Sequence, residues 1–120
     1  MGRRQALYPR QEGATAGALD DALAKARAEL AAGRFFEGHD TLEERWHELP
    51  EGELRVAVQG LIQICAGLHK HAQGNATGAR YLLGRGLAKL HGASGALPSG
   101  SADPFVEAAL RAFAALSEGA

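Results

Sequence analysis

The segment GRFFEGHDTLEERWHEL, residues 33–49, is echoed by GNATGARYLLGRGLAKL, residues 74–90. Each segment opens with a glycine, Gly33 or Gly74, which suits the left-handed turn that follows a helix. Each continues with a small residue and then an apolar ridge, with the aligned pairs Gly38 and Ala79, Leu42 and Leu83, Trp46 and Leu87, and Leu49 and Leu90. This design predicts a helical hairpin of the tetratricopeptide type, used twice.

The flanking segments supply the remaining helices. Apolar residues recur at three- and four-residue steps ahead of Gly33, and Pro50, Gly74 and Gly92 mark later helix ends. The helices are expected at about residues 16–32, 35–49, 52–73, 75–91 and 103–117, with Asn75 and Asp103 as N-caps. Two hairpins are too few for a solenoid. We therefore predict an all-α fold, a compact bundle of about five helices formed by two tetratricopeptide-like hairpins and a C-terminal helix.

The composition and the lengths of the apolar runs restrict the class of protein to which this chain can belong. Residues 1–15 show no periodicity and are expected to form a flexible N-terminal arm, with residues 16–120 as a single helical domain. No apolar run approaches the 18–20 residues of a membrane span, and no apolar region follows the basic N-terminus as in a signal peptide. Cys65 is the only cysteine, so no intrachain disulfide can form. These features favour a cytoplasmic protein without a membrane partner.

Charge is unevenly distributed. Residues 20–53 contain ten acidic and four basic residues, whereas residues 54–102 contain five Lys and Arg and no Asp or Glu. We expect the acidic and basic hairpins to lie against each other, within one chain or across a dimer. Gly60 and Gly67 are positions where another backbone can approach, and a homodimer is the expected assembly. The basic patch lacks interleaved aromatic residues, and we expect no nucleic-acid partner.

The most unusual stretch is FEGHDTLEERW, residues 36–46, where carboxylates surround a histidine between aromatic residues. With QGLIQ at residues 59–63 and GNATGA at residues 74–79, it resembles the motifs E-x-H-[DE]-x-L-E-x-x-W, Q-G-[LIV]-[IL]-Q and G-N-x-x-G-A of the domain of unknown function 309. The resemblance covers roughly residues 16–91. It implies an all-α bundle and no activity, since none is established for that family.

His39 and Glu43 are four residues apart, and a helical wheel places both on an apolar arc with Phe35, Phe36, Leu42, Trp46 and Leu49. One interpretation is a structural network, in which Glu43 accepts hydrogen bonds from His39, from the Trp46 indole or from the Gln59 or Gln63 amide. A second is a metal site with His39 and Glu43 as ligands, completed by Glu37, Asp40, His69 or His71. A third is a small-molecule pocket lined by Trp46, Gln63 and His69.

Two functional hypotheses follow. The first is a non-enzymatic helical interaction or scaffold module that self-associates. The second is a metal-dependent hydrolase or small-ligand-binding protein that uses His39 and Glu43. Cys65 is expected to be a core residue and not a nucleophile.

Overall fold

The computed structural model describes the backbone of residues 2–119 and the side chains of residues 17–118. The helices are α1 (Gly2–Ala31), α2 (Phe35–Trp46), α3 (Glu53–Ala72), α4 (Ala76–Ala93) and α5 (Asp103–Gly119), with a short 3₁₀ helix, η1 (Ser94–Ala96). The described part of the chain has no strand, which confirms the predicted all-α bundle of about five helices. The flexible arm predicted for residues 1–15 lies outside the residues with described side chains. That arm and the domain boundary at residue 16 stay predictions.

The predicted helix ends are found at the glycines. Gly33 and Gly74 have φ angles of 77° and 81°, the left-handed conformation that glycine adopts at low cost. Asn75 caps α4, because its Oδ1 accepts a hydrogen bond of 2.9 Å from the Gly78 amide. The prediction for α2 was too long. Its α-helix ends at Trp46, and the Leu49 amide donates to the Trp46 carbonyl, a tightened turn that replaces the α-helical pattern ahead of Pro50.

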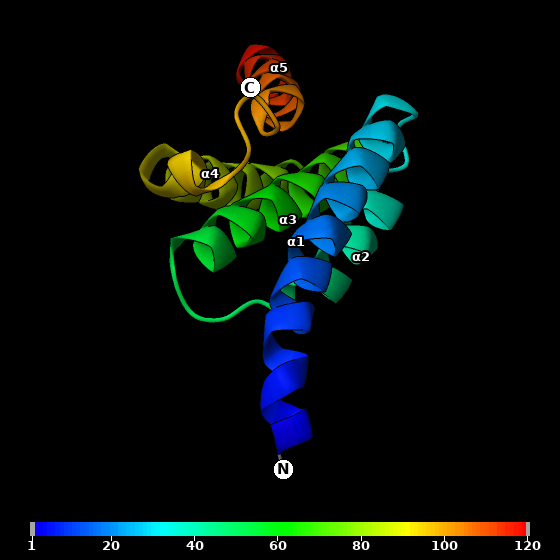
Figure 1. Ribbon diagram of the computed structural model, residues 1–120. Coiled ribbons are helices and arrows are strands. Elements are labelled where there is room, and N and C mark those ends of the chain that lie inside the picture. Colours follow the sequence, from blue (N-terminus) through cyan, green and yellow to red (C-terminus); the bar gives the residue numbers. More distant parts are fainter. Residues whose placement is uncertain (1, 120) are drawn as a thin grey trace.

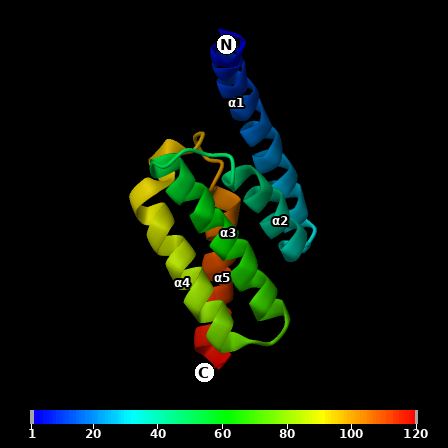
Figure 2. The same cartoon turned by 90° about the horizontal axis from the view of Figure 1, so that it is seen from below.

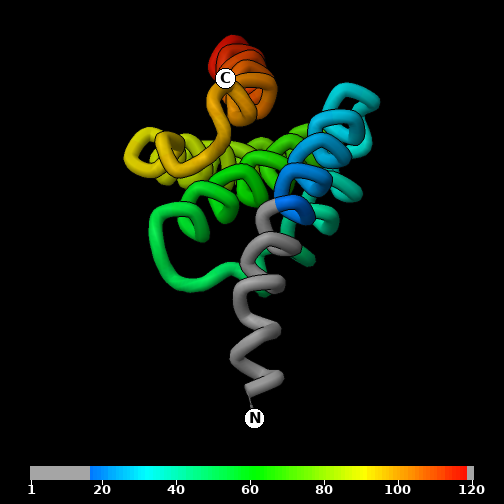
Figure 3. Tube along the Cα trace, in the orientation of Figure 1, coloured from blue at the N-terminus to red at the C-terminus, as the bar shows by residue number. Residues whose placement is uncertain are grey.

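Helix α3 is the centre of the arrangement. Figure 1 shows α1 and α2 as one hairpin on one side of α3, with α4 on the other side and α5 above α3 and α4. Seen from below in Figure 2, α3 and α4 run side by side, and α5 lies behind them and runs in roughly the same direction. The trace in Figure 3 follows the chain from the α1–α2 hairpin through the long connection into α3. Two helical hairpins and a final helix are the predicted architecture.

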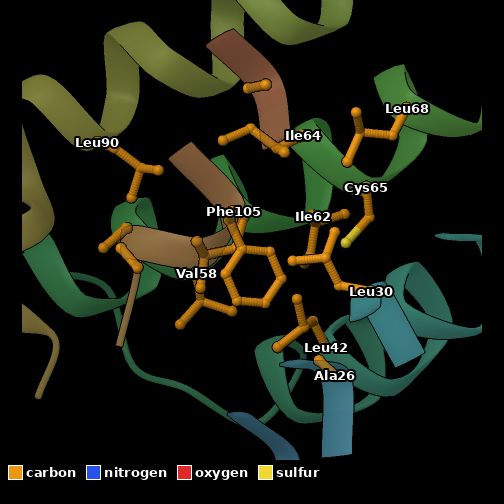
Figure 4. Close-up of a cluster of buried hydrophobic side chains, with 14 of the residues drawn as sticks. Ala26, Leu30, Leu42, Val58, Ile62, Ile64, Cys65, Leu68, Leu90 and Phe105 are labelled. Carbon is orange, nitrogen blue, oxygen red and sulfur yellow. The ribbon is translucent and has the colours of Figure 1, made fainter. Parts of the chain in front are cut away.

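The core is built from the aligned positions of the two similar segments, residues 33–49 and 74–90. Gly38 and Ala79 are buried, as are the pairs Leu42 and Leu83, and Leu49 and Leu90, while Trp46 and Leu87 are both half-buried. The fifth helix completes this core with Phe105, which is fully buried. In Figure 4 its ring lies beside Val58 of α3, with Leu42 of α2 and Ala26 of α1 nearby. All five helices therefore contribute to one hydrophobic core.

The glycines of α3 serve the contact between α3 and α4. A Cβ atom at Gly60 would lie 3.0 Å from the carbonyl oxygen of Gly86, and a Cβ at Gly67 would lie 2.7 Å from Leu83 Cγ. These distances are too short for a side chain, so the two backbones approach only because both positions are glycine. The expected close approach is present, but its partner is α4 of the same chain. Gly60 and Gly67 thus give no support to a homodimer.

Candidate functional site

The motif helix α2 buries a different arc from the one that the helical wheel predicted. Gly38 and Leu42 are buried, whereas Phe36 is 52% exposed and His39 and Glu43 are only half-buried. The reason is that α2 packs against two helices at once. A Cβ at Gly38 would lie 3.3 Å from Cys65 Sγ of α3 and 3.8 Å from the Ala26 carbonyl oxygen of α1. Contact with α1 turns the buried arc toward Gly38 and leaves Phe36, His39 and Glu43 at its edge.

His39 has a different hydrogen-bond partner from the one predicted. Its Nδ1 atom lies 3.0 Å from Oδ1 of Asp40, and no hydrogen bond joins it to Glu43 among the described side chains. The Phe36 ring stacks on the imidazole with 5.7 Å between centroids. His39, Asp40 and Glu43 each offer a ligand atom, and these atoms lie within 4.8 Å of one another. The residues that converge are therefore an imidazole and two carboxylates from successive turns of one helix.

Trp46 is positioned by α3 and not by Glu43. Its indole N–H donates a hydrogen bond of 3.0 Å to the Arg55 carbonyl oxygen. The guanidinium carbon of Arg55 lies 3.9 Å from the centre of the Trp46 ring, and the same guanidinium donates to the Leu49 carbonyl oxygen over 2.6 Å. Trp46 and Arg55 together close the end of the α2–α3 contact, where a planar cation stacks on an aromatic face.

The remaining predicted site residues are not gathered into one network. The Phe36 and His69 rings are 5.3 Å apart, which brings His69 to the same aromatic ring as His39. The Oε1 atom of Gln63 is buried without a hydrogen-bond partner in the described structure. Gln59 is half-buried, and no described hydrogen bond joins it or Gln63 to Glu43. The predicted network around Glu43 was therefore wrong in its bonds. No described groove is lined by Trp46, Gln63 and His69 together.

The buried carboxylate of the first hairpin is Glu29, which the sequence reasoning passed over. Glu29 is 6% exposed. Thr41 of α2 donates to its Oε1 over 2.8 Å, and Lys25 donates to its Oε2 over 2.6 Å. Burial by itself raises the pKa of Glu29, but these two hydrogen bonds and the nearby positive charges of Lys25 and Arg34 hold that pKa below its usual value. A signal was present, since Glu29 follows Ala26 by three residues and therefore lies near the predicted apolar face of its helix.

Cys65 lies in the core near this carboxylate. It is fully buried, and burial followed by the negative charge of Glu29 raises the pKa of its thiol to about 12. At neutral pH the thiol is protonated, and the nucleophilic form is the thiolate. Cys65 is thus a core residue, as predicted.

A groove opens between α1 and α5. It has a volume of about 490 Å³ and a mostly apolar floor that includes Leu30, Phe35, Leu68, Ala108 and Ala112. Arg27, His71, Glu107 and Arg111 are the charged or titratable side chains that line it. A second groove of about 520 Å³ lies farther along α1 and shares Arg27 and Pro104 with the first. The sequence reasoning did not find this surface, because its residues come from four helices, α1, α2, α3 and α5.

Comparison with known proteins gives one match. The family described as domain of unknown function (DUF309) matches residues 23–82, from within α1 to the first turns of α4. That range contains the motif helix, the central helix α3 and the Gly74 turn. No curated protein and no solved structure matches the chain. None of the helices in the described part of the chain combines the length and the apolar character that crossing a bilayer requires.

Proposed function

Because the chain belongs to the family of the domain of unknown function 309, whose function is not established, we propose its role from the geometry: a non-enzymatic helical interaction module. The binding surface is the groove between α1 and α5. The observation that carries this proposal is a groove of about 490 Å³ with an apolar floor and an arginine at each side, Arg27 on α1 and Arg111 on α5.

The groove has the properties of a surface that takes a segment of another protein. Here α3 is covered by α2 on one side and α4 on the other, while Leu68 and Phe35 line the groove where α1 and α5 separate. Apolar side chains at the floor and charged groups at the rim are the usual arrangement of a protein-binding surface.

A peptide selection tests this role. Random peptides displayed on phage are selected against the purified chain and then measured against Ala108→Trp, which fills the groove from α5. We expect the selected peptides to shift the amide NMR signals of Arg27, Leu30 and Arg111, and to lose binding to Ala108→Trp. Thermal unfolding of the variant checks that it is folded. Equal binding to the variant, no enriched peptide, or signal shifts confined to other helices would count against the groove.

We also propose a homodimer in the cytoplasm. Its support is the general prevalence of two-fold pairs among soluble oligomers. Light scattering at tens of micromolar should give the mass of two chains. A monomer mass at this concentration would contradict the proposal.

A second candidate function is a divalent metal site at His39 and Glu43, used for hydrolysis or for binding a small ligand. It is favoured by the convergence of His39, Asp40 and Glu43, whose ligand atoms lie within 4.8 Å of one another. Atoms that bind one ion at about 2.1 Å cannot be farther apart than about 4.2 Å, so the three side chains would have to draw together slightly. Water would complete the coordination, and a metal-bound water is an effective nucleophile near neutral pH.

Metal titration separates this candidate from the interaction module. Zinc or manganese should raise the melting temperature of the purified chain, and His39→Ala and Glu43→Gln should each abolish the shift. His91→Ala is the matched control, because His91 is an exposed histidine on α4. A melting temperature that no divalent ion changes would end the metal hypothesis.

A further inference from the structure

We infer that the occupant of the α1–α5 groove is a short acidic segment of a partner protein, with apolar side chains between its carboxylates. This inference rests on the proposed function, because it names the partner of the same surface. It is carried by the charge and the dimensions of the groove.

In the first groove two arginines, Arg27 and Arg111, lie with one carboxylate, that of Glu107. Arg27 is half-buried and Arg111 is exposed, and neither forms an ion pair with any described residue. Glu107 lies in the same groove one helical turn from Arg111, yet the two side chains are not paired. A half-buried guanidinium without a carboxylate has lost part of its hydration and has donors to spare. Carboxylates bind such groups through two parallel hydrogen bonds, which makes them the complementary chemistry.

Arg27 and Pro104 line both grooves, so the two grooves adjoin along α1. The first groove reaches Ala31, the second reaches Asp20, and Arg27 lines both. The eleven steps along α1 from Asp20 to Ala31 span about 16 Å, which is the length of about five extended residues or about three turns of a helix. This length suits a short peptide segment better than a single small molecule. Asp20 lines the second groove and disfavours a carboxylate there, so the acidic residues of the segment are expected in the first groove, beside Arg27 and Arg111.

The apolar floor sets the second requirement. Leu30 and Leu68 are already nearly covered, and Phe35 and Ala108 are half-buried. The floor can therefore accept one or two apolar side chains and not a whole hydrophobic helix face. Most of the specificity must then come from the arginines. Binding should weaken with added salt, since interactions between partly exposed charges are screened.

Three synthetic peptides test the inference, each three helical turns long with leucine at the same positions. One carries glutamate at the remaining positions, one lysine and one glutamine. We expect only the glutamate peptide to bind in the groove, as measured by fluorescence anisotropy and by the amide NMR signals of α1 and α5. Arg27→Glu with Arg111→Glu should weaken its binding by about tenfold or more. The matched control is Arg85→Glu, an exposed arginine on α4 outside the groove, which should leave binding unchanged.

The outcomes separate the inference from the proposed function. If the lysine or glutamine peptide binds the groove as tightly as the glutamate peptide, the acidic partner is wrong and the binding groove stands. The same holds if peptides from the selection bind the groove but lack acidic residues. If the glutamate peptide binds Arg27→Glu with Arg111→Glu as well as it binds the natural chain, the inference is also overturned. If neither the selected nor the designed peptides shift groove signals, both proposals fail.

Discussion

Thr41 of α2 donates its hydroxyl hydrogen to Glu29 of α1 over 2.8 Å, which joins the two helices of the first hairpin through a buried carboxylate. Lys25 donates to Thr41 over 3.1 Å and to the other oxygen of Glu29, so the three side chains form a closed group. Gly38 lies beside it, since a Cβ there would be 3.9 Å from Glu29 Cβ. The first hairpin is thus held by a polar network on α1 and α2, away from His39 and Glu43.

The network predicts that Thr41→Val destabilises the fold. The substitution keeps the shape of the side chain but leaves Glu29 with one hydrogen bond fewer, and hydrogen bonds to charged groups contribute about 1.5–3 kcal/mol. The free energy of unfolding, measured by urea titration, should fall by that amount. Thr77→Val is the control, because Thr77 is exposed on α4 and should change stability by less than about 0.5 kcal/mol. Equal losses in the two variants would contradict the role of the network.

The lowered pKa of Glu29 predicts a loss of stability in acid. A carboxylate with a lower pKa in the folded state adds stability that is fully present above its unfolded value, near 4.5, and is lost as pH falls through the folded value. The natural chain should therefore lose more unfolding free energy between pH 7 and pH 3 than Glu29→Gln does. Urea titrations of both at the two pH values measure this difference. A larger acid loss in Glu29→Gln would show that the sign is wrong.

The contact between α3 and α4 predicts opposite effects for two glycines of one helix. At Gly86 a Cβ would lie 2.7 Å from the Gly60 carbonyl oxygen, so Gly86→Ala should cost about 1–3 kcal/mol despite the higher helix propensity of alanine. At Gly84 the nearest described atom is Phe113 Cζ at 3.7 Å. Gly84→Ala should therefore stabilise the fold by up to about 1 kcal/mol. Thermal and urea unfolding distinguish them, and a gain at Gly86 would mean that the two helices can separate without loss.

Trp46 should contribute through its ring and its indole N–H separately. Trp46→Phe keeps an aromatic ring beneath Arg55 but removes the donor to the Arg55 carbonyl oxygen, which should cost about 1 kcal/mol. Trp46→Ala removes the ring as well and should cost about 3 kcal/mol, the lower end of the range for aromatic truncation, because the side chain is half-buried. Urea titration measures both. A loss below about 1 kcal/mol for Trp46→Ala would show that the ring stabilises little.

Cys65 should be unreactive in the folded chain. Its thiol has a pKa of about 12 and no exposed surface, so at pH 8 almost none of it is the thiolate that attacks disulfide reagents. A colorimetric thiol assay should give no signal in buffer and one thiol per chain in concentrated urea. Rapid reaction in buffer would mean that the core around Cys65 opens readily.

Much of the fold could be predicted because its signals are local. Gly33 and Gly74 end helices through their own backbone conformations, and Asn75 caps α4 with a residue three positions away. The echo between the two hairpins aligned Leu42 with Leu83 and Leu49 with Leu90, and all four are buried. The prediction failed at the end of α2. The position of Leu49 fits the spacing of the helix, but its amide forms a turn hydrogen bond where the chain leaves α2.

The candidate site depended more on tertiary structure. The i,i+4 spacing placed His39 and Glu43 on one side of a helix, but not on its buried face, because α1 and α3 both pack on α2 and only their positions fix which arc is covered. His39 is hydrogen-bonded to its neighbour Asp40, and the packing of α2 on α3 brings Trp46 to the Arg55 carbonyl oxygen.

By itself the sequence determined the helices, most of their ends and the two-hairpin design, since helix periodicity, glycine turns and caps act over a few residues. Only the tertiary structure decided which residues meet across helices, Thr41 with Glu29 and Gly60 with Gly86, and that Arg27 and Arg111 line one groove. Such contacts depend on the angles and distances at which whole helices pack. The sequence pattern of one helix does not indicate how the neighbouring helix is rotated about its own axis.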